Sequence, residues 1–211
     1  MDKLNHIAEQ ALQALGARHK TREKALELSR HLTRHSANTI RAVHRGEFQK
    51  AAEMLDEGRQ VVDQFNADLA EEPDIYKAGY VQDALKEFAE ASITHALITE
   101  RSLPGPDELN VDYPAYLNGL GEAMGELRRA ILDLIRHGDL TRAEKLLNTI
   151  DEVYSVLVTV DYPEAITRGL RRTTDMVRGV LERTRGDLTM AVRQQRLEKT
   201  LKEFEDKILD R

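Results

Sequence analysis

The stretch Gly138-Asp139-Leu140-Thr141-Arg142-Ala143 decides the fold class, because it has the composition of a tight turn between two helices. Glycine tolerates the left-handed conformation that follows a helix, and an acidic residue beside it favours the start of the next one. The same order of glycine, acid, Leu or Phe, and Ala three positions later returns at residues 46–51 and 186–191. Because the intervals are unequal, they indicate shared turn chemistry rather than a solenoid repeat. The sequence therefore predicts an all-α protein.

Proline-containing segments mark further helix boundaries. Val-Asp-Tyr-Pro occurs at residues 111–114 and 160–163, and an Asp cap with Pro in the first turn is typical of a helix start. Residues 72–74 and 104–106 also interrupt the chain. We expect a single-domain bundle over residues 1–211, with a bend at Gly16 in its first helix. It has about seven long antiparallel helices, at about 3–45, 47–70, 74–102, 113–137, 140–159, 163–185 and 187–209.

The composition of the chain excludes several classes of protein. Its 211 residues are 41% hydrophobic and 32% charged, which suits one globular domain and not a disordered chain. The absence of cysteine excludes disulfides, thiolate metal sites and cysteine nucleophiles. No apolar run approaches the roughly 20 residues of a membrane span, and the N-terminus has no signal-peptide core. We therefore expect a cytoplasmic protein with no membrane partner.

Positive charge is concentrated in the first predicted helix. Residues 17–45 carry eight Lys or Arg and two Glu, whereas the whole chain has a formal charge of -6. Arg30, Arg34, Arg41 and Arg45 fall within roughly 60° of one another on a helix, next to His44. A cationic ridge of this kind can bind the phosphates of a nucleic acid. Alternatively, it can be a solvated helix face whose charges pair with acidic residues elsewhere in the chain. Any nucleic-acid function depends on this local patch.

Two pairs of carboxylates occur on consecutive long helices. Glu87 and Glu90 lie three residues apart, and Glu122 and Glu126 lie four apart on the next helix. If these helices are antiparallel neighbours, up to four carboxylates can converge. Such an all-oxygen cluster suits Mg²⁺ or Mn²⁺, which can activate water for phosphoryl transfer. Acids exposed on a helix are also common without any metal, so spacing alone leaves both interpretations open.

Two other classes of metal-dependent helical protein also hold their metals with clusters of acidic side chains. A di-iron bundle needs Glu-x-x-His pairs, and the sequence contains none. The all-α MazG-like nucleotide pyrophosphatases do combine Glu-x-x-Glu with a second acidic pair, and they remain an alternative. A small nucleotide does not require a long basic ridge, which favours a polymeric substrate.

Several segments together resemble the translin/Trax family. The matching segments are residues 21–30 (TREKALELSR) with 39–45, residues 86–91 (KEFAEA) with 101–103, residues 116–120 (YLNGL) and residues 125–129 (GELRR). The segment KEFAEA, with residues 101–103, resembles the third helix of the Trax branch in particular. The likeness runs with similar spacing from about residue 20 to residue 190, including the turn at Gly138.

The resemblance implies an all-α subunit that assembles into a hollow octamer and binds single-stranded RNA or DNA. In the Trax branch it further implies Mg²⁺-dependent endoribonuclease activity. The Trax catalytic acids match Glu87, Glu90 and Glu122, with Glu126 as the glutamate of the Gly-Glu-Leu segment. Glu122 stands where Trax usually has Asp, and only Lys77 matches the second basic region of translin. A non-catalytic, translin-like binder of single strands is the alternative.

Overall fold

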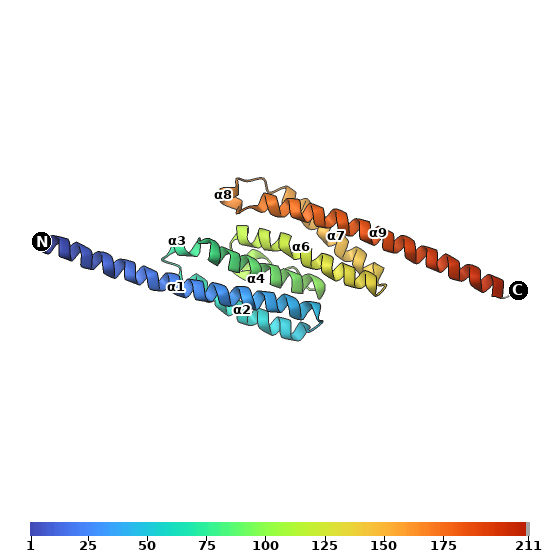
Figure 1. Cartoon of the computed structure of the whole chain (residues 1–211), viewed down its shortest axis with the longest axis horizontal. Helices are drawn as coiled ribbons and strands as arrows, with labels where there is room; N and C mark the ends of the chain where they lie inside the picture. The colour runs from blue at the N-terminus through green and yellow to red at the C-terminus, as the bar shows by residue number, and fades with distance from the viewer. Residues whose placement is uncertain (210–211) are drawn as a thin grey trace.

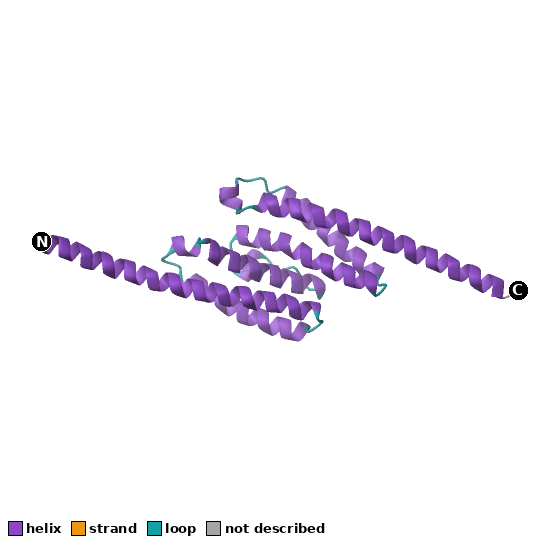
Figure 2. Cartoon of the chain, in the orientation of Figure 1, coloured by secondary structure: helices purple, strands orange, loops and turns teal. Residues whose placement is uncertain are grey.

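The computed structural model describes residues 1–209, so the last two residues of the expected 1–211 domain lie outside the described residues. Within the described residues all regular structure is helical, and the helices are joined by short loops (Figure 2). The helices are α1 (Asp2–His44), α2 (Phe48–Asp68), α3 (Pro73–Tyr76), α4 (Gly79–Ile98), α5 (Pro106–Leu109), α6 (Tyr113–Arg136), α7 (Leu140–Val158), α8 (Glu164–Thr167) and α9 (Leu170–Leu209).

Helices α4 and α6 form the centre of the bundle. Figure 1 shows them side by side, with α1 and α2 packed on the α4 side and α7 and α9 packed on the α6 side. Helix α4 is buried on almost every face, with Leu85 and Phe88 enclosed, and α6 contributes Met124 and Leu127 to the same core. Burial of these large apolar side chains is the main favourable term that holds the bundle together.

Two of the three predicted glycine turns are present. Gly46 ends the turn after α1 with a φ of +74°, and Gly138 does so after α6 with a φ of +80°. At the second turn the Asp139 side chain accepts a hydrogen bond from the Arg142 backbone N–H at 3.1 Å and so caps α7. The expected acidic cap is therefore confirmed at this turn.

The third predicted turn, at Gly186, is wrong. Helix α9 runs through Gly186 without interruption, so the expected helices at 163–185 and 187–209 are largely one helix. The buried residues Val177, Leu181, Thr184 and Leu188 recur at spacings of four, three and four. This apolar stripe continues across the glycine and favours an unbroken helix, since a turn there would end its packing against the bundle.

Two predicted helix starts are also displaced. Pro73 and Pro163 each open a helix of only four residues, and the long helices α4 and α9 begin later, at Gly79 and Leu170. The long helices in the described residues therefore number six, with three short ones, instead of about seven. The expected bend at Gly16 does not interrupt α1, which is helical throughout residues 2–44.

Two helical arms leave the bundle at opposite ends. Figure 1 shows the first part of α1 and the last part of α9 extending beyond the other helices. Each arm carries large apolar side chains that are more than half exposed: Leu4, Ile7, Leu12 and Leu15 on α1, and Leu197, Leu201, Phe204 and Ile208 on α9. No helix in the described part of the chain has the length and apolarity needed to cross a bilayer.

Candidate metal centre

A single glycine brings α6 against the backbone of α4. A Cβ added at Gly119 would lie 2.6 Å from the Lys86 carbonyl oxygen and 3.0 Å from the Glu90 backbone nitrogen. Only a residue without a side chain permits this approach. One turn after Gly119, α6 presents Glu122 to the face of α4 that carries Glu87 and Glu90.

Three of the four predicted carboxylates meet at this contact. One oxygen from each of Glu87, Glu90 and Glu122 lies within 4.8 Å of the other two. The three side chains are partly withdrawn from solvent, and Glu90 is only 9% exposed. We call Glu87, Glu90 and Glu122 the carboxylate triad. Its oxygen-only donor set matches the preference of hard divalent cations such as Mg²⁺ and Mn²⁺.

The carboxylates of the triad are partly buried and lie close to one another, which raises the pKa of two of them. Burial, together with the negative charges of Glu122, Glu87 and Glu126, raises the pKa of Glu90 to about 8, although nearby Lys86 lowers it in part. Burial also raises the pKa of Glu87, an effect that nearby Lys86 partly offsets. Buried carboxyl groups that repel one another are typical of functional sites, because a bound cation relieves both the repulsion and the loss of hydration.

Lys86 supplies the positive charge that the triad contacts. Its Nζ donates to Glu122 Oε1 at 2.7 Å, and the two side chains are 22% and 32% exposed. Burial lowers the pKa of Lys86, but the bond to Glu122 and the charges of Glu122 and Glu87 outweigh this and raise it overall. Sequence reasoning missed this lysine, although it lies in the KEFAEA segment directly before Glu87.

Glu126 and His44 pair with each other. The Nε2 atom of His44 lies 2.5 Å from Glu126 Oε2, and the hydrogen bond from His44 lowers the pKa of Glu126. Glu126 is thus not one of the three clustered carboxylates, although its charge reaches Glu90. The His44 side chain is 5% exposed, so the structure does not place it on the exposed cationic ridge.

The four arginines expected on the ridge are all exposed along α1. Among the residues that the structure describes, none of them forms an ion pair, which leaves their charges available to a ligand. These residues are Arg30, Arg34, Arg41 and Arg45. Lys77 lies after the short helix α3 and forms an ion pair with Asp112, so its charge is partly neutralised.

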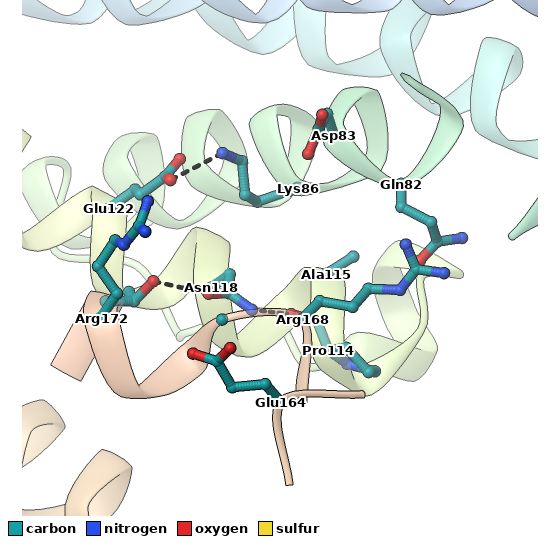
Figure 3. Close-up of a pocket in the computed structure, with 12 residues that line it drawn as sticks. Gln82, Asp83, Lys86, Pro114, Ala115, Asn118, Glu122, Glu164, Arg168 and Arg172 are labelled. Atoms are coloured by element: carbon teal, nitrogen blue, oxygen red, sulfur yellow. Dashed lines mark hydrogen bonds and ion pairs between the residues drawn. The ribbon is translucent and has the colours of Figure 1, made fainter. Parts of the chain in front are cut away.

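A pocket of about 360 Å³ adjoins the triad: Glu122 belongs to both, and Lys86, which pairs with Glu122, also lines the pocket. Figure 3 shows its walls, which come from α4, the first half of α6 and the corner between α8 and α9. The sequence did not predict this pocket, because its lining residues come from α4, α6, α8 and α9, which are far apart in the chain. Its arginines, Arg168 and Arg172, belong to none of the motifs described above.

The chain has close relatives in sequence and structure, although no protein-family model matches it. It is 30% identical over 204 residues to the uncharacterized protein MJ0175 of Methanocaldococcus jannaschii, covering 96% of this chain and 88% of that protein. It superposes on the AfC3PO–duplex RNA complex with a TM-score of 0.82 and 30% identity, over 87% of this chain and 95% of that one. C3PO is the translin/Trax complex.

The chain belongs to the translin/Trax family. A second AfC3PO structure agrees, with a TM-score of 0.81 and 30% identity over 87% of this chain and 96% of that one. Apo-NeC3PO has a TM-score of 0.77 at 20% identity, covering 90% of this chain and 98% of that one, which shows the shared fold. The expected translin/Trax membership and all-α fold are therefore confirmed.

Proposed function

We propose that this translin/Trax protein is a divalent-metal-dependent endoribonuclease of the Trax branch that cuts single-stranded RNA, with single-stranded DNA as a second substrate. The observation that carries this proposal is the triad of Glu87, Glu90 and Glu122, whose oxygens lie within 4.8 Å. Nucleic-acid binding is supported by the related AfC3PO, which was solved with duplex RNA.

The triad would hold the metal, Mg²⁺ or Mn²⁺, through one oxygen from each carboxylate. A cation held there would lower the pKa of a water for attack on the phosphodiester and would stabilise the charge that develops on the phosphate. Burial and the neighbouring carboxylates raise the pKa of Glu90 to about 8, so Glu90 would have to lose its proton for the triad to hold the cation. Glu126 would complete or orient the site, held in one position by His44.

The chain's own cations would position the substrate. Lys86 pairs with Glu122, and its ammonium group would be free to contact a phosphate if that carboxylate were a metal ligand. The unpaired ridge arginines would hold the strand farther away through its phosphates, in a manner independent of base sequence. Lys77 would add a weaker contact, since it shares its charge with Asp112.

A homo-oligomer, with eight copies as the expected number, is part of this proposal. The exposed apolar residues of each arm recur at helical spacing, as at Leu197, Leu201, Phe204 and Ile208. Stripes of this kind mark surfaces that another protein covers. The mass of the particle in solution, measured by light scattering after size exclusion, tests this part. An octamer of 24.0 kDa subunits supports it, and a monomer contradicts it.

Cleavage of a labelled single-stranded oligoribonucleotide tests the catalytic proposal. Wild type with Mg²⁺ should cut within the strand, and Glu87→Gln and Glu122→Gln should each lose about 100-fold or more in rate, because the metal then lacks a ligand. The exposed Glu144 on α7 is a matched control, and Glu144→Gln should cut like wild type. Equal rates in all four proteins would refute the metal centre.

A non-catalytic, translin-like binder is the second candidate. The Lys86–Glu122 ion pair favours it, because the ammonium group offsets part of the negative charge with which the triad would attract a cation. In that case all the variants would bind RNA with the same salt dependence, and none would cut. A third class, the MazG-like pyrophosphatases, is tested in the same assay by offering nucleoside triphosphates, which we expect to remain intact.

A further inference from the structure

The pocket beside the triad is lined by polar side chains that have no role in the metal centre, among them Arg168, Arg172 and Gln82. It lies on the side of Lys86 and Glu122 where the α8–α9 corner covers the first half of α6 (Figure 3). Its volume of about 360 Å³ lies near the lower end of the range of about 300–1,000 Å³ that small-molecule sites occupy. A space of this size suits a single small ligand.

Hydrogen bonds hold the α8–α9 corner in one conformation. The buried Asn118 donates to the Thr167 carbonyl oxygen at 2.9 Å and accepts from the Thr173 hydroxyl at 2.6 Å. Between these residues, Arg168 adopts a φ of +52°, a conformation that a non-glycine residue rarely takes. Its guanidinium donates to the Lys77 carbonyl oxygen at 2.7 Å. The corner therefore presents a fixed arginine to the pocket.

A second arginine of the corner, Arg172, forms no ion pair with the residues that the structure describes. Arg172 lines the pocket from the first turn of α9, and in Figure 3 its side chain extends to the end of the pocket where Glu122 and Lys86 lie. Among the described residues it forms no ion pair, in contrast to Arg178 on the same helix, which pairs with Asp175. An unpaired guanidinium in a pocket is a ready donor to a phosphate group.

The opposite wall contains an acceptor without a donor. Gln82 is 3% exposed, and its Nε2 donates to the Tyr76 carbonyl oxygen at 3.0 Å. Because that carbonyl can only accept, the amide nitrogen must face it and Oε1 must face away. Oε1 is buried and has no hydrogen-bond partner in the structure. Buried acceptors are rarely left unsatisfied, so this oxygen calls for a ligand that carries an N–H or O–H group.

We propose that the pocket is a subsite for one nucleotide unit, which places a phosphate against Arg172 and a sugar hydroxyl or base N–H at the other end, against Gln82 Oε1 beside Arg168 (Figure 3). A nucleotide has both groups that the two walls require. This inference rests on the proposed function, since a unit held here would place its neighbouring phosphodiester bond beside the triad. Three acids also line the pocket. Glu122 is paired with Lys86, and Asp83 and Glu164 lie exposed, as Arg168 and Arg172 do, so water screens charges of both signs there.

The subsite should bind a free nucleoside monophosphate in the absence of metal. Isothermal titration calorimetry of the full chain with adenosine monophosphate, in a chelating buffer, measures this binding directly. Inorganic phosphate and adenosine are the comparison probes, and each should bind at least tenfold more weakly than the nucleotide. No binding of the nucleotide, or equal binding of inorganic phosphate, would overturn the assignment.

Two variants test the contribution of each pocket wall to nucleotide binding separately. Arg172→Gln should weaken nucleotide binding about tenfold, whereas Arg171→Gln, at an exposed neighbour that does not line the pocket, should change it less than twofold. Gln82→Met should weaken the binding of the nucleotide but not that of inorganic phosphate. Equal affinities in the Arg172 and Arg171 variants would overturn the proposal, after circular dichroism has verified that both are folded.

The same titration distinguishes this inference from the proposed nuclease. Glu87→Gln removes a triad ligand but leaves the pocket walls intact, so it should bind the nucleotide like wild type. If wild type cuts RNA but does not bind the nucleotide, the subsite fails and the nuclease stands. If the nucleotide binds but no RNA is cut, the nuclease fails and the subsite stands.

Discussion

Replacement of Glu90 by glutamine should stabilise the metal-free protein at alkaline pH. The pKa of Glu90 rises from its ordinary value of 4.5 to about 8 in the folded state, because the carboxyl group is buried among like charges. A carboxyl whose pKa is raised by folding contributes its full stability below pH 4.5 and loses it as the pH rises through 8. Glutamine is neutral throughout this range and carries no such dependence.

The magnitude follows from the two pKa values. A difference of about 3.5 pH units at about 1.4 kcal/mol each corresponds to about 5 kcal/mol of unfolding free energy lost between pH 4.5 and pH 9. This is a large part of the total stability of a typical domain, about 5–15 kcal/mol. Glu90→Gln should remove most of that slope, so its advantage over wild type should grow steadily with pH.

Urea denaturation in a chelating buffer at pH 5, 6, 7 and 8 measures the effect. Glu144→Gln, at an exposed glutamate on α7, is the control and should follow wild type at every pH. Excess Mg²⁺ at pH 8 should reverse the order, because it stabilises the wild-type triad and not the variant. Parallel pH profiles for wild type and Glu90→Gln would refute the electrostatic reasoning.

Three further perturbations test the geometry around the triad. Gly119→Ala should destabilise the fold by about 1–3 kcal/mol and weaken Mn²⁺ binding in calorimetry, because the added Cβ would lie 2.6 Å from the α4 backbone. The control is Gly125→Ala on the same helix, whose Cβ would meet nothing within 4 Å. This control should be neutral or stabilising by up to about 1 kcal/mol. Equal losses in both would contradict the close-contact role. Lys86→Met should bind Mn²⁺ about tenfold more tightly, because no ammonium then competes for the carboxylates, and weaker binding would contradict this. Arg34→Gln should reduce the salt-dependence slope of RNA binding by about 0.7, as expected for one lost phosphate contact, while Lys145→Gln should leave it unchanged; identical slopes would exclude Arg34 from the interface.

Local sequence signals predicted most of the helices but failed where two signals compete. Gly46 and Gly138 do end helices, whereas Gly186 has the same neighbours and lies inside α9. What differs is the buried stripe of residues at helical spacing that continues past Gly186. Glycine permits a turn, but the packing of the flanking apolar residues determines whether one forms.

The candidate site was predictable only in part, for a similar reason. The spacing of Glu87 and Glu90 and the resemblance to Trax identified three acids that the fold does bring together. The pairing of Glu126 with His44 could not be predicted, because it depends on how the end of α1 lies against α6. The unsatisfied oxygen of Gln82 likewise exists only in the folded chain, where Tyr76 orients the amide.

A crystal of the full chain soaked in Mn²⁺ tests the metal centre most directly. Anomalous scattering at the manganese edge should show a peak within coordination distance of one oxygen from each of Glu87, Glu90 and Glu122, with Lys86 turned away from Glu122. A map with manganese elsewhere, or with none at a saturating concentration and pH 8, would contradict the assignment of these carboxylates as metal ligands.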